Sequence, residues 1–254
     1  MARFESKTVI VTGGGTGIGY AIAKRFYDED AAVVICGRRE AALREAAEQI
    51  AAEPGRLLTV QVDIADEADV TRLVAETLSW RGRIDVLVNN AAAMRVDKAP
   101  EATTLAEWRS VIDTNLTGTF LCCREAGKAM IAQHSGKIVN VASMSGRIVN
   151  KYFHGGSYEV SKAGVIMLTK TLATEWARYN INVNAVAPGY YDTQPNRTFF
   201  AQEADLHERV LDLIPLHRLG SLDELSDLIL TLASDAANYM TGSVITIDGG
   251  YTLW

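Results

Sequence analysis

The segment TVIVTGGGTGIG, residues Thr8 to Gly19, sets the class of fold expected for this chain of 254 residues. A short β-branched run leads into a glycine-rich turn, and a pattern of helical period starts at Ile18. The glycines let backbone N–H groups approach a pyrophosphate, and the N-terminus of the following helix favours its negative charge. A lone glycine cluster can be only a tight turn. This one opens the first strand–helix unit, where such folds bind a dinucleotide.

The rest of the chain repeats this alternation of strand and helix. Most of the β-branched runs are apolar throughout, which is typical of strands buried on both faces of a parallel sheet. The predicted strands are Thr8–Thr12, Ala32–Cys36, Leu57–Val62, Ile84–Val88, Lys137–Val141, Ile181–Val186 and Val244–Ile247. The predicted helices are Ile18–Tyr27, Glu40–Ala52, Glu67–Trp80 with Asp66 as its cap, Leu105–Gln133, Ser157–Tyr179 and Asp223–Ala233. The pattern predicts an α/β fold: a doubly wound, seven-stranded parallel sheet of Rossmann type with helices on both faces.

The domain organisation is expected to be simple. No segment is polar and proline-rich enough to be a linker, so residues 1–254 are predicted to form a single dinucleotide-binding and catalytic domain. Residues 190–216 interrupt the alternation, with no clear strand, two prolines and the aromatic residues Tyr190, Tyr191, Phe199 and Phe200. A long irregular segment after the end of a strand is more often a binding loop than filler. We therefore predict that 190–216 is a substrate-binding loop.

Composition excludes several classes of function. With 25 basic and 31 acidic residues and no basic block, the chain is not expected to bind nucleic acid. It has no uncharged apolar run of about 18 residues, so no membrane span is expected. The first apolar run is too short to be a signal peptide, and Cys36, Cys122 and Cys123 are expected to be free thiols, which together predict a cytoplasmic location. The four histidines lack metal-binding spacing, so no metal site is expected.

Several motifs, in order along the whole chain, resemble those of the classical short-chain dehydrogenase/reductase family. They are the TGxxxGxG turn at Gly13, Gly17 and Gly19, NNAA at 89–92 where the family has NNAG, Asn115 in TNLTG, Ser143, the YxxxK pair Tyr158 and Lys162, Pro188 and Gly189 with Thr193, and IDGG at 247–250. The resemblance implies an NAD(P)-dependent alcohol dehydrogenase or carbonyl reductase that is usually a homotetramer. The long helices predicted over 105–133 and 157–179 are apolar enough to pack against a second copy.

The resemblance implies catalytic roles for Ser143, Tyr158, Lys162 and Asn115. A tyrosine phenol with a pKa of about 10 is a poor base at neutral pH. Lys162 lies one helical turn from Tyr158, so its positive charge, with an oxidised nicotinamide nearby, is expected to lower that pKa. Ser143 is expected to hydrogen-bond the substrate oxygen, with Ser145 as a nearby competitor. For Asn115 the resemblance alone implies a kinked helix and a water leading toward Lys162.

The choice of cofactor depends on the end of the second strand. Gly37 stands where an acidic residue would bind the adenosine ribose, and Arg38 and Arg39 follow it. An arginine there suits a 2′-phosphate, so NADP(H) is favoured and NAD(H) stays possible, because the arginines could instead point into solvent and Thr16 adds no second charge. The predicted cofactor contacts are Gly13, Thr16, Gly17, Ile18, Gly19, Arg38, Arg39, Asp63, Ile64, Asn90, Ala91, Ala92, Tyr158, Lys162, Pro188, Gly189 and Thr193.

The motifs do not select the substrate. The predicted substrate contacts are Ser143, Met94, Ser145, His154 and Tyr190, with Tyr152 and the Phe199–Phe200 pair beside them. Stretches around 157–174 resemble gluconate 5-dehydrogenases, so a polyol or sugar acid is the first hypothesis and a 3-oxoacyl-acyl-carrier-protein reductase the second. Two further hypotheses stay open: a dinucleotide-binding regulatory protein without catalysis, and an epimerase or dehydratase on the same scaffold.

Overall fold

The computed structural model describes residues 3–51 and 55–254. Within these residues, seven strands form one sheet in the order β3-β2-β1-β4-β5-β6-β7, and every neighbouring pair is parallel. The strands are β1 (Thr8–Thr12), β2 (Ala32–Gly37), β3 (Leu57–Gln61), β4 (Val86–Asn89), β5 (Gly136–Val141), β6 (Ile181–Pro188) and β7 (Val244–Ile247). The strand order reverses direction between β1 and β4, which is the topological switch point of a Rossmann-type sheet. The predicted fold class is confirmed.

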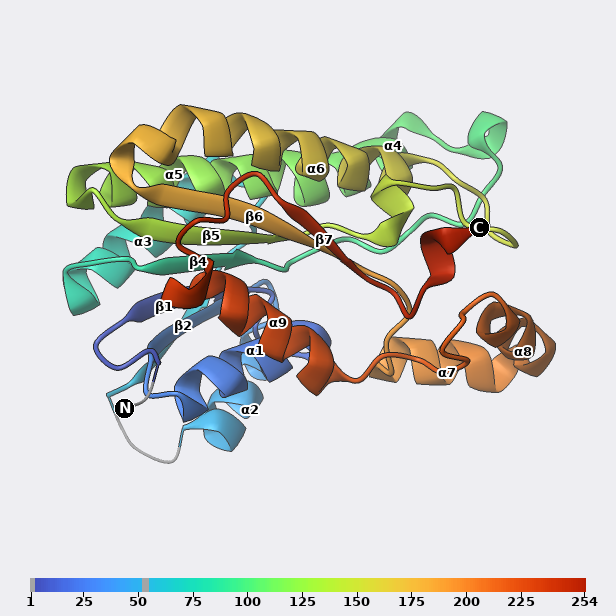
Figure 1. The fold of residues 1–254 in the computed structure, drawn as a ribbon, viewed down its shortest axis with the longest axis horizontal. Coiled ribbons are helices and arrows are strands. Elements are labelled where there is room, and N and C mark those ends of the chain that lie inside the picture. The colour runs from blue at the N-terminus through green and yellow to red at the C-terminus, as the bar shows by residue number, and fades with distance from the viewer. Residues whose placement is uncertain (1–2, 52–54) are drawn as a thin grey trace.

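Helices cover both faces of the sheet (Figure 1). One face carries α1 (Gly17–Asp28), α2 (Glu40–Ile50) and α9 (Leu222–Ala233), and the other carries α3 (Glu67–Arg81), α4 (Leu105–Ile112), α5 (Thr119–Gln133) and α6 (Ser157–Trp176). Successive residues of β1 enter opposite cores: Val9 and Val11 belong to the core that includes α1, and Ile10 to the core that includes α3 and α5. Both faces of the strand are therefore buried, which explains its unbroken apolar sequence.

Helix ends follow local signals, and one predicted helix is interrupted. The Asp66 carboxylate accepts hydrogen bonds from two backbone N–H groups at the start of α3, which confirms it as a cap. The predicted single helix 105–133 is divided by a π-helical turn over Asp113–Gly118. That turn places Asn115 toward the chain segment after β4, a contact between distant residues that helical periodicity does not report. The predicted end of α2 at Ala52 lies outside the described residues.

Residues 190–216 are a correction to the sequence prediction. They are not irregular, because they contain α7 (Gln194–Gln202) and α8 (Ala204–Asp212). These two short helices bury Phe200 and Val210 in a small separate core, which we call the α7–α8 core; it consists of Met144, Phe200, Val210, Ile214 and Tyr251. Its members come from three distant parts of the chain, so tertiary packing accounts for much of the stability of helices too short to form alone.

The remaining expectations concern membrane spans and cysteines. In the two described ranges, no helix combines the length and the apolar character that crossing a membrane requires. Cys36, Cys122 and Cys123 are buried as free thiols, as expected. Burial raises the pKa of the Cys36 thiol to about 12, so this side chain acts as an apolar core residue.

Candidate active site

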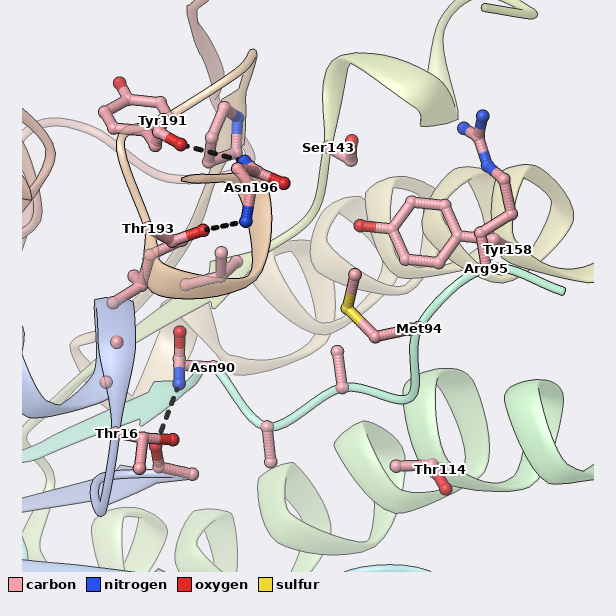
Figure 2. A pocket seen from close by; sticks show the side chains of 18 of the residues that line it. Thr16, Asn90, Met94, Arg95, Thr114, Ser143, Tyr158, Tyr191, Thr193 and Asn196 are labelled. Carbon is pink, nitrogen blue, oxygen red and sulfur yellow. Dashed lines mark hydrogen bonds between the residues drawn. The ribbon is translucent and has the colours of Figure 1, made fainter. Parts of the chain in front are cut away.

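A cleft of about 860 Å³ opens at the carboxyl ends of the parallel strands. Its walls come from the chain after each of the strands β1 to β6 and from α6 and α7. Figure 2 shows part of this lining. Each residue predicted to contact the cofactor lines this cleft, as do Met94, Ser143, Ser145 and Tyr190 among the predicted substrate contacts. The fold thus brings together motifs that are spread over most of the sequence, at the edge where such sheets bind ligands.

The glycine-rich turn has the shape that a dinucleotide requires. Gly17 has a φ of +54° and open space where a side chain would stand, at the first residue of α1. A Cβ on Gly19 would lie 2.1 Å from the carbonyl oxygen of Gly13, so only glycine permits this tight return of the chain. An open turn against a helix N-terminus fits the pyrophosphate of a dinucleotide.

Thr12 joins the glycine turn to the segment after β4. Its hydroxyl oxygen accepts hydrogen bonds from the backbone N–H groups of Asn90 and Ala91, each at 3.0 Å. The amide nitrogen of Asn90 in turn donates to the carbonyl oxygen of Thr12, also at 3.0 Å. These hydrogen bonds therefore connect the ends of β1 and β4 across the cleft floor.

Ser143, Tyr158 and Lys162 meet at one wall of the cleft. Ser143 follows β5 and is buried, and its side chain accepts a hydrogen bond from the backbone N–H of Ser145 at 3.1 Å. Tyr158 lies in the first turn of α6 and directs its hydroxyl into the cleft beside Ser143 (Figure 2). Lys162 is buried one turn further along α6, with its Nζ 5.7 Å from the centre of the Tyr158 ring.

The charges around Tyr158 differ in part from the sequence expectation. Burial raises the pKa of the Tyr158 phenol, while hydrogen bonding to Ser143 and the positive charge of Arg95 act to lower it. Lys162 donates to the carbonyl oxygen of Val141 at 2.8 Å, and burial lowers the pKa of its ammonium group to about 8. Burial therefore outweighs the two lowering influences on the phenol, which come first from the hydrogen bond with Ser143 and then from Arg95, a residue that the motifs do not mark.

Asn115 holds the segment after β4 and does not line the cleft. Its side chain pairs with both backbone groups of Ala93, accepting from the N–H at 2.7 Å and donating to the carbonyl oxygen at 3.2 Å. It also donates to the Ser161 hydroxyl at 3.1 Å. Asn115 lies within the π-helical turn, and π-turns often occur at functional sites. The side chain connects that turn to α6, between Tyr158 and Lys162 in sequence.

Arg95 and Asn150 line the cleft and were missed by the sequence reasoning. Arg95 forms an ion pair with Glu159, the residue after Tyr158, and is largely buried. A lone charge after the apolar segment Ala91–Met94 was a detectable signal for Arg95. Asn150 lies in the loop between Ser143 and Tyr158, where no local pattern marks it. The positions of both side chains at the cleft depend on contacts with residues that are distant in sequence.

Two of the expected substrate-side residues lie elsewhere. His154 is exposed and does not line the cleft, although its backbone N–H donates at 2.8 Å to the carboxylate of Asp97, which does line it. Tyr152 is also outside the cleft lining, with a left-handed φ of 72° and an exposed ring. By contrast, Phe199 and Phe200 of α7 do line the cleft. Aromatic residues in the segments around the cleft therefore do not all line it, and packing decides which of them do.

Arg38 and Arg39 lie at the far end of the cleft from Tyr158, by the glycine turn. Both are exposed, and the Arg39 guanidinium donates to the Thr16 hydroxyl at 3.2 Å. This contact keeps Arg39 over the turn. The residue at the end of β2 is Gly37, so this corner of the cleft carries two cations after β2 and no carboxylate directly at the strand end.

Comparisons with known proteins agree with this geometry. The family model described as enoyl-(acyl carrier protein) reductase matches residues 13–252. A galactitol 2-dehydrogenase (L-tagatose-forming) from Cereibacter sphaeroides is 38% identical over 99% of this chain and 97% of its own length. A 3-oxoacyl-acyl-carrier-protein reductase from Synechocystis sp. is 38% identical over 100% of both chains. The chain belongs to the short-chain dehydrogenase/reductase family.

A solved structure supports the same conclusion. The short-chain dehydrogenase from Bacillus anthracis superposes with a TM-score of 0.90 at 38% identity, over 98% of this chain and 97% of that one. As a member of the short-chain dehydrogenase/reductase family, the protein is an NAD(P)-dependent oxidoreductase of the alcohol dehydrogenase and carbonyl reductase type. The resemblance of its motifs to this family is confirmed over the whole chain.

Proposed function

We propose that this enzyme interconverts a secondary alcohol of a polyol and the corresponding ketone, with Tyr158 as the acid and base. The observation that carries the proposal is the meeting of Ser143, Tyr158 and Lys162 at one wall of a cleft whose other end is the glycine turn. The galactitol dehydrogenase among the relatives supports a polyol as substrate. A sugar acid is the other member of this substrate class.

The side chains divide the work as follows. Ser143 binds the substrate oxygen and stabilises charge on it as the carbonyl becomes an alcohol, or the reverse. Tyr158 takes the hydroxyl proton during oxidation and returns it during reduction. Lys162 and Arg95 supply positive charge near the phenolate, and Asn115 acts as a positioning residue through Ala93 and Ser161. The dinucleotide, when bound, supplies or accepts the hydride.

For the cofactor we propose NADP(H) in preference to NAD(H). Arg38 and Arg39 follow the strand end where an acidic residue would otherwise bind the ribose, and Arg39 is held over the turn by Thr16. A guanidinium binds a 2′-phosphate through charge-assisted hydrogen bonds. In Arg38→Ala and Arg39→Ala variants, kcat/KM for NADPH should fall about tenfold while that for NADH changes little. Equal effects on both cofactors would assign the arginines another role.

The reaction is tested with a panel of alcohols and ketones. Each is assayed with NAD(H) and with NADP(H) separately, and the absorbance of the reduced nicotinamide is measured. Tyr158→Phe should abolish turnover and leave dinucleotide binding nearly intact. Turnover that survives this change would exclude Tyr158 as the acid and base. Binding without turnover of any substrate in the wild-type protein would favour the regulatory alternative, and substrate conversion without net change in the absorbance would favour an epimerase or dehydratase.

A 3-oxoacyl thioester reductase is the second candidate function. The Synechocystis relative and the description of the family model favour it. Acetoacetyl-coenzyme A in the same panel separates the two candidates, because a polyol enzyme should reduce it poorly.

We also propose that the enzyme is a cytoplasmic homotetramer. Several large apolar side chains of α4, α5 and α6 are exposed; they are Leu105, Trp108, Phe120, Val160 and Met167. Exposed apolar residues that gather on neighbouring helices favour burial against a second copy. Light scattering coupled to size-exclusion chromatography measures the mass directly, and a monomer at micromolar concentration would contradict the assembly.

A further inference from the structure

The wall beside Ser143 carries three polar side chains that neither give nor take the transferred proton. Arg95, Ser145 and Asn150 line the cleft and contact one another. The amide nitrogen of Asn150 donates to Ser145 Oγ at 2.6 Å, and the Arg95 guanidinium donates to the same oxygen at 3.4 Å. The group adjoins the reacting position, since the Ser145 backbone N–H donates to Ser143 Oγ at 3.1 Å.

Hydrogen-bonding capacity remains unused in this group. Ser145 Oγ already accepts two hydrogen bonds, and among the described residues none is recorded as the acceptor of its hydroxyl hydrogen. Asn150 is buried, and in the part of the chain that the structure describes its Oδ1 has no donor. Buried polar atoms without partners are rare in native proteins, so each calls for an explanation. Here the group offers a donor and an acceptor to a ligand.

The charge of the group is compensated inside the protein. Arg95 forms its ion pair with Glu159, whose other carboxylate oxygen accepts from the Gly156 backbone N–H at 2.9 Å. The Arg95 and Glu159 side chains are 16% and 9% exposed, so the pair is largely removed from water and its charges interact strongly. An anionic substrate would therefore meet a cation that is already paired.

We propose that Arg95, Ser145 and Asn150 form a subsite for a second hydroxyl group of the substrate, and that this subsite selects uncharged polyols over sugar acids and simple alcohols. A hydroxyl both donates and accepts, which matches the Ser145 hydroxyl together with the Asn150 carbonyl. A ketone or carboxylate oxygen only accepts and would leave Asn150 unpaired. A site built to hydrogen-bond a hydroxyl discriminates strongly against analogues that lack it.

The test compares matched alcohols and rests on the proposed function. Each secondary alcohol is paired with its vicinal diol, 2-butanol with 2,3-butanediol and 2-hexanol with 1,2-hexanediol, and galactitol is compared with gluconate. For the wild type we expect the ratio of kcat/KM, diol over monoalcohol, to be at least about tenfold, and galactitol to be preferred to gluconate. Ser145→Ala and Asn150→Ala should each lower the diol ratio about tenfold, with dinucleotide binding unchanged in a fluorescence titration. Ser110→Ala, an exposed serine on α4, is the matched control and should keep the ratio.

The outcomes separate this proposal from the proposed function. Turnover with equal ratios in the wild type and both variants would overturn the subsite and leave the alcohol dehydrogenase intact. A preference for gluconate over galactitol would overturn the selection of uncharged substrates. No turnover of any alcohol or of its ketone with either cofactor would overturn the proposed function, and the subsite with it. Circular dichroism of each variant shows whether it is folded, and Ser145→Ala, which removes one oxygen atom, keeps the test valid if Asn150→Ala does not fold.

Discussion

At the scale of single residues, the least expected feature is the pair of opposite charges beside Tyr158. Arg95 lies with its guanidinium 5.7 Å from the centre of the Tyr158 ring, and its ion-pair partner Glu159 is the next residue along α6. The positive charge lowers the pKa of the phenol and the carboxylate raises it. Lys162, at a similar distance from the ring, is the other charged group near the phenol.

Arg95→Met is therefore expected to shift the pH profile of the enzyme. Removal of the cation leaves the Glu159 carboxylate unpaired beside Tyr158, so the phenol should hold its proton to higher pH. The pH at which kcat/KM for alcohol oxidation reaches half its maximum should rise by about one unit, which corresponds to about 1.4 kcal/mol. The measurement is a pH–rate profile at saturating cofactor.

The double variant Arg95→Met with Glu159→Gln is the control for this prediction. It removes both charges, so its profile should return toward that of the wild type, and a glutamine oxygen can still accept from the Gly156 N–H. If the pH–rate profile of Arg95→Met coincides with that of the wild type, Arg95 does not influence the phenol electrostatically. Equal loss of activity at every pH would indicate a purely structural role.

At the scale of elements, α7 and α8 form a cover that is packed separately from the two main cores. Phe200 is 5% exposed and stacks on His207 of α8, with ring centres 4.6 Å apart. It also contacts the Tyr190 ring edge to face at 6.1 Å. Because the α7–α8 core is small, this unit should open at a lower free energy than the sheet.

Phe200→Ala is expected to loosen this unit. Replacing a phenylalanine of a main core with alanine lowers the free energy of unfolding by about 3–5 kcal/mol. Phe200 lies in the separate α7–α8 core, so we expect the free energy of unfolding of the sheet to fall by less. Limited proteolysis within 194–212 should become at least several-fold faster, and KM for the alcohol should rise more than KM for the cofactor. Tyr239→Ala, at a fully exposed aromatic residue outside α7 and α8, serves as the matched control. Unchanged proteolysis would mean that the α7–α8 core does not hold the cover in place.

At the scale of the whole molecule, the buried Lys162 couples stability to pH. Its ammonium group has a pKa of about 8 in the folded protein, against 10.5 for a solvated lysine, because burial disfavours the charge. Between about pH 8 and pH 10 the unfolded chain therefore binds more protons than the folded one, and stability from this group must rise with pH. Below pH 8 both states hold the proton, and the cost of burying the charge is fully present.

Lys162→Met is expected to raise the free energy of unfolding at pH 7 while abolishing activity. The pKa difference corresponds to an upper limit of about 3 kcal/mol, and loss of the hydrogen bond to Val141 offsets about 1 kcal/mol of it. The measurement is urea unfolding of the wild type and the variant, without dinucleotide, at several pH values. The difference in the free energy of unfolding between variant and wild type should become smaller from pH 7 to about pH 9.5. A difference that is constant with pH would contradict the assigned pKa.

The sequence alone determined the class of fold and the motif residues of the site. Unbroken apolar runs that alternate with helical periods are compatible with a parallel sheet covered on both faces, and that sheet brings the ends of its central strands to one edge. Motifs placed at those ends, such as the glycine turn, Ser143 and Pro188, must then line one cleft. These features depend on residues close together in the chain, so a local pattern reports them.

Only the tertiary structure decided what surrounds the motifs. The exposed position of His154 outside the cleft lining is one such feature, with its backbone bonded to the distant Asp97. The π-helical turn at Asn115 and the helices within 190–216 also make contacts with residues far apart in sequence. The same holds for Arg95 and its ion pair with Glu159. These contacts are stabilised by burial and hydrogen bonding in the folded protein. The periodicity of the sequence reports local structure and does not specify which distant residues come into contact.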